Sequence, residues 1–239
     1  MSLNEILIIN KPQGITSHDV VDRVRTLYPK EKVGHAGTLD PLATGILIIL
    51  IGNATKRQAE FMGQEKEYVT EMTLGIETDT YDSDGAILAE KPNNLLMKIN
   101  RGEIEEILPL FTGEIAQTVP PYSAVKIRGK KLYEHARANT ITPDMLPTRT
   151  VTIKELSLLE FQPGSATQKP RAKLLIVCSK GTYIRSLVHD IGIKLGCGAM
   201  IISLTRTRIG LMKLDNALTL EDMRKKGISN PLTDAEKGI

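Results

Sequence analysis

The residues best suited to chemistry lie in one glycine-rich segment, V-G-H-A-G-T-L-D-P-L-A-T-G, at positions 33–45. Its three glycines permit a tight loop whose backbone can approach a ligand closely. Asp40 precedes Pro41, and the resulting bias toward an extended backbone holds the carboxylate at the edge of the loop. Such a carboxylate can act as a nucleophile or as a general base. A lone Asp-Pro pair is more often a plain turn, so the segment by itself leaves both interpretations open.

Hydrophobic patterning predicts the elements that hold this segment. Thr16 and Asp19 have the spacing of a capping box, apolar residues then follow at helical intervals, and Pro29 ends the run. We therefore expect a strand over 6–9, a helix from Thr16 to the residue before Pro29, a loop over 34–45 and a buried central strand over 46–51.

Strands and helices alternate irregularly in the rest of the chain. An acidic turn, DTYDSDG, separates a strand over 67–74 from a second strand that begins at Ala86, which predicts a hairpin. We expect helices over 104–110, near 137 and over 182–195, and strands over 151–161 and 173–178. Because the pattern is not a strict βαβ repeat, it favours an α+β fold with a mixed sheet.

Composition excludes several classes of protein. The chain has 239 residues, of which 41% are hydrophobic and 25% charged, as in ordinary globular proteins. No apolar run approaches the roughly 20 residues that span a bilayer, and the N-terminus lacks the basic region of a secretory signal. Cys178 and Cys197 form no CxxC, and the four histidines have no metal-ligand spacing. We expect a cytoplasmic protein with reduced thiols and no structural zinc.

Charge is distributed unevenly along the chain. The net charge is only +3, but positions 60–114 hold four basic and thirteen acidic residues, whereas positions 115–215 hold sixteen basic and six acidic residues. The basic segment suits a phosphate-rich partner such as RNA. Acidic and basic faces of one fold can also neutralise each other, so charge alone leaves the partner open.

The glycine-rich segment resembles the active-site motif of the TruB-type tRNA pseudouridine synthases. Five further segments resemble motifs of the same family: NKPQGITSHDVV at 10–21, KEY at 66–68, PPYSAVKIRGKKLYEHAR at 120–137, CSKGTYIRSLVHDIG at 178–192 and ISLTRTRIG at 202–210. Six ordered segments are far more than chance provides, and the chain is identified as a member of this family. The resemblance implies the pseudouridine synthase catalytic fold, with a mixed, largely antiparallel central sheet flanked by helices.

The resemblance also implies three catalytic residues. Asp40 matches the family's nucleophile or general base, and Arg185 matches the arginine that pairs with it. Tyr68 matches the tyrosine that stacks on the flipped uracil and is a candidate for removing its C5 proton. An arginine close to an aspartate lowers the carboxyl pKa by about 1–3 units, which would keep Asp40 ionised.

Other residues match positions that contact substrate or RNA. Lys11 and Pro12 match a motif that braces the catalytic loop, Tyr183 and Leu204 match the lining of the uracil pocket, and His35 matches a histidine that contacts the opened T-loop. A basic insertion around 120–150 matches the RNA-gripping segment of the family. It holds four basic residues in six positions, namely Lys126, Arg128, Lys130 and Lys131.

The implied reaction is isomerisation of the T-loop uridine at tRNA position 55 to pseudouridine, by base flipping and Asp-dependent remaking of the glycosidic bond. Because substrate and product are isomers, we expect no cofactor and no metal ion. We expect the tRNA T-arm as the partner, no membrane, no obligatory protein partner and a monomer. A tRNA-folding chaperone role can accompany the catalysis.

We expect a single catalytic domain over 1–239, of the bacterial type that works without a guide RNA. Bacterial members usually carry a C-terminal PUA-type domain, and this sequence ends before a complete one.

Two other classes of function compete with this interpretation. A non-catalytic RNA-binding module would need a basic groove, but it would not need Asp40, Tyr68 and Arg185 together. A glycoside hydrolase normally needs two flanking carboxylates, and the Asp40 loop contains no second acid. A pseudouridine assay on unmodified tRNA separates the three classes.

Overall fold

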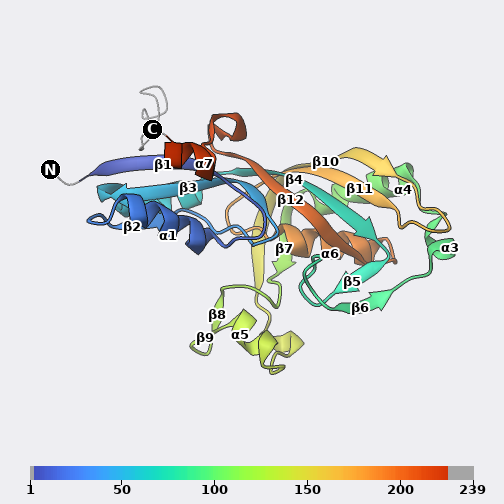
Figure 1. The fold of residues 1–239 in the computed structure, drawn as a ribbon. Coiled ribbons are helices and arrows are strands. Elements are labelled where there is room, and N and C mark those ends of the chain that lie inside the picture. Colours follow the sequence, from blue (N-terminus) through green and yellow to red (C-terminus); the bar gives the residue numbers. More distant parts are fainter. Residues whose placement is uncertain (1–2, 226–239) are drawn as a thin grey trace. The chain divides into compact units, whose positions relative to one another are not determined.

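The computed structural model of the protein describes residues 3–225. The chain forms two compact units, the first from Met1–Val69 with Leu204–Ile239 and the second from Thr70–Ser203. Its largest sheet has nine strands with the main order β1-β3-β12-β4-β11-β10-β7, and β4 (Lys66–Leu74) and β12 (Ala199–Ile209) have residues in both units (Figure 1). Among the described residues, no helix is long and apolar enough to cross a membrane.

The first unit is built around β3 (Thr44–Gly52), whose residues 45–51 are all buried. Two strands, β1 (Asn4–Lys11) and β2 (Val33–His35), pair with β3 in the antiparallel sense. Strand β12 pairs with it in the parallel sense, with Arg206 opposite Gly45, and β13 (Met212–Lys213) pairs with β12. Side chains alternate between the two faces of a strand, and separate apolar clusters cover the two faces of β3. This arrangement explains its uninterrupted apolar sequence.

Helix α1 (Ser17–Leu27) packs against one face of this sheet. Thr16 caps the helix, with reciprocal hydrogen bonds to Asp19 that complete the predicted capping box. Val20, Val21 and Val24 are fully buried. The remaining helices of this unit are α2 (Gln58–Gly63), α7 (Leu220–Lys225) and the 3-10 helices Asn53–Arg57 and Leu214–Asn216.

The second unit has an antiparallel run of long strands. Strand β10 (Thr148–Gln162) pairs with β11 (Arg171–Cys178) on one side and with β7 (Gly113–Thr118) on the other. Two small hairpins, β5 (Ile76–Thr78) with β6 (Ile87–Glu90) and β8 (Lys126–Ile127) with β9 (Lys130–Lys131), belong to this unit (Figure 1). Its helices are α3 (Asn93–Leu96), α4 (Arg101–Ile107), α5 (Leu132–Arg137), α6 (Ile184–Lys194) and the 3-10 helices Leu108–Phe111 and Pro143–Met145.

The predicted α+β class with a mixed, mostly antiparallel sheet is confirmed, and the strands expected over 6–9, 46–51, 67–74, 151–161 and 173–178 are all present. The predicted hairpin was wrong in one of its two strands, the strand over 67–74. The strand after the acidic turn pairs with β5, because Gly75 at φ 85° ends β4 first. The predicted loop over 34–45 is shorter than expected, since residues 34 and 35 belong to β2 and residues 44 and 45 to β3.

Candidate active site

Asp40 lies half-buried in the loop between β2 and β3. The backbone carbonyl of every residue from 37 to 41 accepts a hydrogen bond. The Ser17 hydroxyl, at the start of α1, donates to the Leu39 carbonyl (3.0 Å) and accepts from the Leu39 N–H (2.8 Å). The Asp40 carbonyl accepts from the Ala43 N–H (3.1 Å). A loop paired in this way holds one conformation, which gives the Asp40 carboxylate a fixed base.

Lys11 ends β1 and has an exposed fraction of 0%. Its ammonium group donates to the carbonyls of Pro12 (2.9 Å), Ile15 (2.8 Å) and Pro41 (3.3 Å). Three acceptors match the three hydrogens of an ammonium. Burial lowers the pKa of Lys11 to about 8, against an opposing effect of the nearby Asp40 charge. These contacts tie Lys11 to the Asp40 loop, and its role in catalysis stays a prediction.

Arg206, on β12, holds the same loop from another direction. Its side chain has an exposed fraction of 1%. The guanidinium donates to the carbonyls of Ile46 (2.7 Å), Gly37 (3.1 Å) and Thr38 (3.4 Å). Gly45 lets the Arg206 backbone pair closely with β3, because a Cβ at Gly45 would lie 2.3 Å from the Arg206 carbonyl oxygen, and its φ of 99° also favours glycine.

His35 is half-buried at the end of β2, five residues before Asp40 in the sequence. Burial lowers its pKa, and the Arg206 charge lowers it further, so the imidazole is neutral at neutral pH. Its carbonyl accepts from the Gln58 side-chain amide (2.8 Å), and its Nδ1 has no hydrogen-bond partner among the described residues. The Nδ1 atom is itself buried, and the predicted contact of His35 with RNA stays a prediction.

Tyr68 lies on β4 and is buried, with an exposed fraction of 8%. Arg208 of β12 fixes the residues just before it. Its Nη2 lies 2.9 Å from Glu65 Oε1, its Nε lies 3.2 Å from Glu67 Oε2, and its Nη1 donates to the Gly210 carbonyl (3.0 Å). Two of the three guanidinium nitrogens therefore help to set the position of the strand that carries the tyrosine.

Arg185, on α6 in the second unit, is buried at 5% exposure. Its Nη1 donates to the Thr80 carbonyl (2.8 Å) and its Nη2 to the Tyr122 carbonyl (2.9 Å). Its Nε lies 3.6 Å from Oδ2 of Asp82, which is equally buried. Ion pairs are stronger in such low-dielectric surroundings than in water. The expected pairing of Arg185 with Asp40 would join the two units and stays a prediction.

Tyr183 precedes α6, and Gln117 of β7 fixes its backbone. The buried Gln117 amide accepts from the Tyr183 N–H (2.8 Å) and donates to the Tyr183 carbonyl (3.0 Å). Two reciprocal bonds determine where the Tyr183 side chain leaves the backbone. Among residues 3–225, no group of three His, Cys, Asp or Glu side chains could hold a metal ion.

Comparison with protein-family models shows to which family this chain belongs. The model described as TruB family pseudouridylate synthase (N terminal domain) matches residues 25–184, and the model of the tRNA pseudouridylate synthase B C-terminal domain matches residues 185–233. The chain belongs to the TruB family. It shares 44% identity over 222 residues with tRNA pseudouridine synthase B of Pelotomaculum thermopropionicum, covering 93% of this chain and 68% of the relative. With tRNA pseudouridine synthase B of Geobacillus kaustophilus it shares 45% identity over 225 residues, covering 94% and 77%.

Solved structures agree with the TruB family assignment. The chain resembles a protein in the crystal structure of a Cbf5-Nop10-Gar1 complex with a TM-score of 0.68 and 29% identity, covering 94% of this chain and 57% of that one. It resembles a protein of the archaeal box H/ACA sRNP Nop10-Cbf5 complex with a TM-score of 0.66 and 27% identity, covering 93% and 53%. The chain thus spans little more than half the length of these structures. Their fold confirms the predicted pseudouridine synthase fold.

In this TruB family chain the predicted site residues fall into two groups. The first unit holds Asp40, Lys11, His35, Tyr68 and Leu204, and the second holds Tyr183, Arg185 and the basic insertion. Leu204 is buried at 7% exposure on β12, and the Thr44 hydroxyl lies 3.5 Å from its carbonyl. Its place in a uracil pocket stays a prediction.

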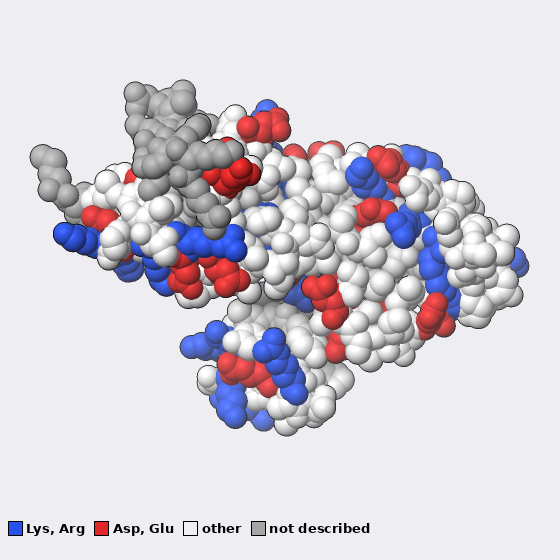
Figure 2. Space-filling view, in the orientation of Figure 1, with Lys and Arg blue, Asp and Glu red and all other residues white. Residues whose placement is uncertain are grey.

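The basic insertion contains a hairpin that the sequence patterning did not predict. Arg128 and Gly129 form its turn with φ of 50° and 84°, values typical of a type I′ turn. Lys126, Arg128 and Lys130 are exposed, whereas Lys131 packs its ammonium 5.3 Å from the ring centre of Tyr133. Figure 2 shows basic side chains gathered where Figure 1 labels β8, β9 and α5.

Four residues with positioning roles were missed by sequence reasoning on this TruB family chain: Ser17, Asp82, Gln117 and Arg206. A signal existed for two of them. Asp82 lies in the acidic turn DTYDSDG, and Arg206 lies in the segment TRTR within a recognised motif. Ser17 and Gln117 act through hydrogen bonds to backbone atoms of residues 22 and 66 positions away, which no local pattern records.

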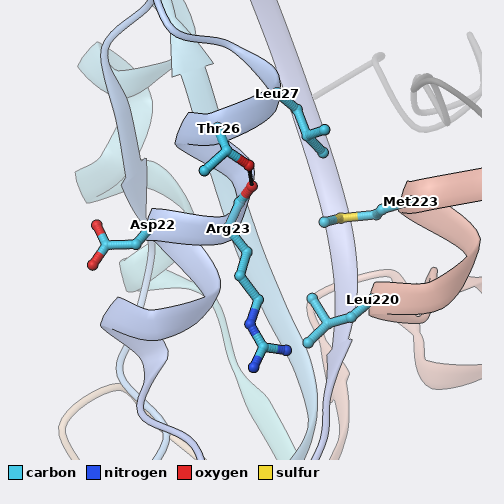
Figure 3. A pocket seen from close by; sticks show the side chains of 6 residues that line it. All are labelled: Asp22, Arg23, Thr26, Leu27, Leu220 and Met223. Atoms are coloured by element: carbon cyan, nitrogen blue, oxygen red, sulfur yellow. Dashed lines mark hydrogen bonds between the residues drawn. The ribbon is translucent and has the colours of Figure 1, made fainter.

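The first unit also has a pocket of about 420 Å³ between α1 and α7 that contains none of the predicted site residues. Figure 3 shows Arg23 beside the apolar side chains of Leu27, Leu220 and Met223. The Thr26 hydroxyl donates to the Arg23 carbonyl (2.7 Å), which is an ordinary helix contact. We assign no role in catalysis to this pocket.

Proposed function

We propose that the protein is a tRNA pseudouridine synthase that isomerises the T-loop uridine at tRNA position 55. The observation that carries the proposal is the Asp40 loop, in which five successive carbonyls are hydrogen-bonded so that one carboxylate is held in place. Membership of the TruB family and relatives named tRNA pseudouridine synthase B support the same conclusion.

The proposed reaction needs only groups that the chain and the substrate supply. The N1–C1′ bond of uridine breaks, the uracil turns, and a C5–C1′ bond forms. The proton on C5 is then released and N1 regains a proton, so the product is an isomer of the substrate. Asp40 either attacks C1′ or removes a proton from C2′. Both routes require an ionised carboxylate.

Supporting roles follow from the two groups of residues. The uridine must leave the RNA stack at a cost of a few kcal/mol, and stacking on Tyr68 would return about 1–3 kcal/mol. Arg185 would pair with Asp40, and Tyr183 and Leu204 would line the pocket. This role for Tyr68 requires the uracil to reach a side chain that is now mostly covered.

The proposed partner is the T-arm of tRNA, which His35 and the basic hairpin would contact. We propose that the protein acts on it as a monomeric, single catalytic domain in the cytoplasm, without an obligatory protein partner. Binding of the phosphate backbone by the hairpin would make affinity strongly dependent on salt.

The test is the release of the uridine C5 hydrogen from an unmodified tRNA transcript, comparing the wild type with Asp40→Asn. The amide keeps the shape of the side chain but cannot serve as nucleophile or base. We expect pseudouridine only with the wild type, only at position 55, and similar tRNA affinity for both proteins. Turnover of Asp40→Asn within about tenfold of the wild type would contradict the proposal, since removing an essential group costs far more.

The basic hairpin also favours a second activity, the folding of tRNA. Refolding of a misfolded transcript should then proceed with Asp40→Asn as well as with the wild type. Refolding that stops in this variant would contradict a separate chaperone role.

A further inference from the structure

Arg206 is a buried cation whose hydrogen bonds to the described residues all go to backbone carbonyls. Its Nε, Nη1 and Nη2 each donate to one carbonyl, and among residues 3–225 no carboxylate forms a salt bridge with it. Burying a charge without a counter-charge is costly. A neutral side chain could pack at the same place without that cost, so the charge itself needs an explanation.

The three carbonyls lie on both sides of Asp40 in the sequence. Gly37 and Thr38 precede the loop's carboxylate, and Ile46 follows it at the start of the buried part of β3. One planar guanidinium therefore connects the two ends of the loop, with donors in a fixed fork. A lysine ammonium has three donors on a single atom and could not span these positions in the same way.

Arg206 also shares its electrostatic surroundings with the other groups of the loop. Its charge lowers the pKa of Lys11 and of His35, while the charge of Asp40 raises that of Lys11. Two buried cations, Lys11 and Arg206, thus hold the backbone of the loop that carries one carboxylate, Asp40.

We propose that Arg206 is a positioning residue for Asp40, which connects the two ends of the catalytic loop and so holds the carboxylate in the geometry that the reaction requires. This role is distinct from that of Arg185, which lies in the other unit and has its own carboxylate partner in Asp82. The inference rests on the proposed function, because pseudouridine formation is its readout.

The experiment compares the full chain and its variants Arg206→Lys, Arg206→Gln and Arg206→Met on an unmodified tRNA transcript. The matched control is Arg25→Met, since Arg25 donates to the Val33 carbonyl (3.3 Å) in the same unit but outside the loop. We measure kcat, KM, tRNA affinity and the thermal unfolding midpoint for each protein.

We expect Arg206→Met to lower kcat by about a hundredfold, the effect of a misplacement of roughly 1 Å, with tRNA affinity unchanged. In Arg206→Met and Arg206→Gln the loss should appear in kcat and leave KM near the wild-type value, because the loop is misplaced while binding is kept. Arg206→Lys should recover only part of kcat, because one ammonium cannot reproduce the planar fork. Arg25→Met should match the wild type.

Two results would overturn the inference: kcat of Arg206→Met within about threefold of the wild type, or wild-type kcat in Arg206→Lys. If the neutral variants do not fold, Arg206→Lys decides alone, and wild-type kcat in it overturns the inference. An inactive wild type would overturn the proposed function, whereas an active wild type with unaffected variants overturns only the role of Arg206.

Discussion

Lys11 keeps its ammonium group fully enclosed beside the catalytic loop, and its pKa is lowered to about 8 mainly by burial. Above that pH the group becomes an amine with two hydrogens facing three carbonyls. One of these three hydrogen bonds then disappears, together with a positive charge near Asp40. We expect kcat for pseudouridine formation to fall as pH rises through about 8.

Stability should change in the opposite direction over this range. The ordinary pKa of a lysine is 10.5, so between about pH 8 and 10.5 the folded protein binds fewer protons at Lys11 than the unfolded chain does. The contribution of Lys11 to the free energy of unfolding therefore rises there. Lys11→Arg, which stays charged, should move the alkaline limb of kcat to higher pH. A limb that stays near pH 8 in this variant would show that another group titrates.

Arg185 and Asp82 form a buried pair whose arginine also holds two backbone carbonyls. We expect Arg185→Met to lower kcat by about a hundredfold or more through misplacement. It should also reduce the free energy of unfolding by about 3–5 kcal/mol, because the Asp82 charge is left without its partner. Arg185→Lys should rescue only part of kcat, since one ammonium cannot reproduce the planar fork.

Asp82→Asn separates the two effects of this pair. The amide can still accept from the Thr80 hydroxyl (2.6 Å) and the Asp84 N–H (3.2 Å), so the turn should keep its shape. We expect a smaller reduction of kcat than in Arg185→Met. Full activity in both Arg185→Lys and Asp82→Asn, measured by single-turnover assays, would exclude a specific geometry for this arginine.

Some of these residues could be identified from the sequence alone, and others could not. Asp40, Lys11 and Arg185 were identified because each lies in a segment that resembles a motif of the family. The partners that position them could not be read in this way. Arg206 contacts Thr38 across 168 positions and Arg185 contacts Thr80 across 105 positions. Such contacts arise from tertiary packing, and the local spacing of residues in the sequence does not predict them.

At the scale of elements, local chemistry predicted most boundaries. The capping box at Thr16 placed the start of α1, and the uninterrupted apolar run placed β3. The β8–β9 hairpin was missed because its strands have two residues each and alternate too briefly to show a period. Its turn was readable, since an Arg-Gly pair between short β segments suits positive φ at the glycine.

The β8–β9 hairpin presents basic side chains for contact with RNA. Replacing Lys126, Arg128, Lys130 and Lys131 with Ala should weaken tRNA binding and flatten its dependence on salt. Removing one phosphate-binding cation lowers the slope of log affinity against log salt by roughly 0.7–0.9, so removing all four lowers it by at most about three. Lys131 should contribute least, because its ammonium lies against Tyr133. Turnover at saturating tRNA should change far less than affinity.

Binding isotherms at several salt concentrations measure this effect. A control variant should replace four lysines that are exposed outside the hairpin, namely Lys30, Lys32, Lys98 and Lys194. An equal reduction of slope in both variants would mean that total charge, and no particular surface, attracts the tRNA. An unchanged slope in the hairpin variant would mean that the hairpin is a surface turn that does not contact the tRNA phosphates.

At the scale of the whole molecule, folding buries some ionisable groups that have no role in the proposed reaction. Asp190 of α6 is one of them, and burial raises its pKa to about 6. Its neighbours include Tyr81, whose pKa is raised by burial and by the charge of Asp190, and whose ring stacks on His189 at 3.9 Å between centres. No role in the reaction is assigned to Asp190.

Asp190→Asn should therefore stabilise the protein at neutral pH. A carboxyl group whose folded pKa is raised from 3.8 to about 6 stabilises the fold fully below about pH 4, and this contribution is lost as pH rises through 6. One pKa unit corresponds to about 1.4 kcal/mol, and solvent screening of the half-buried carboxylate reduces the cost of the ionised group to about 1–2 kcal/mol at pH 8. Urea unfolding at pH 8 and pH 4 should show a higher midpoint for the variant only at pH 8. Asp144→Asn provides the control. Asp144 is exposed and a hydrogen bond from Thr142 lowers its pKa, so replacing it with a neutral residue should not raise the urea midpoint. Equal midpoints for Asp190→Asn and the wild type at pH 8 would mean that water reaches the Asp190 carboxylate in solution.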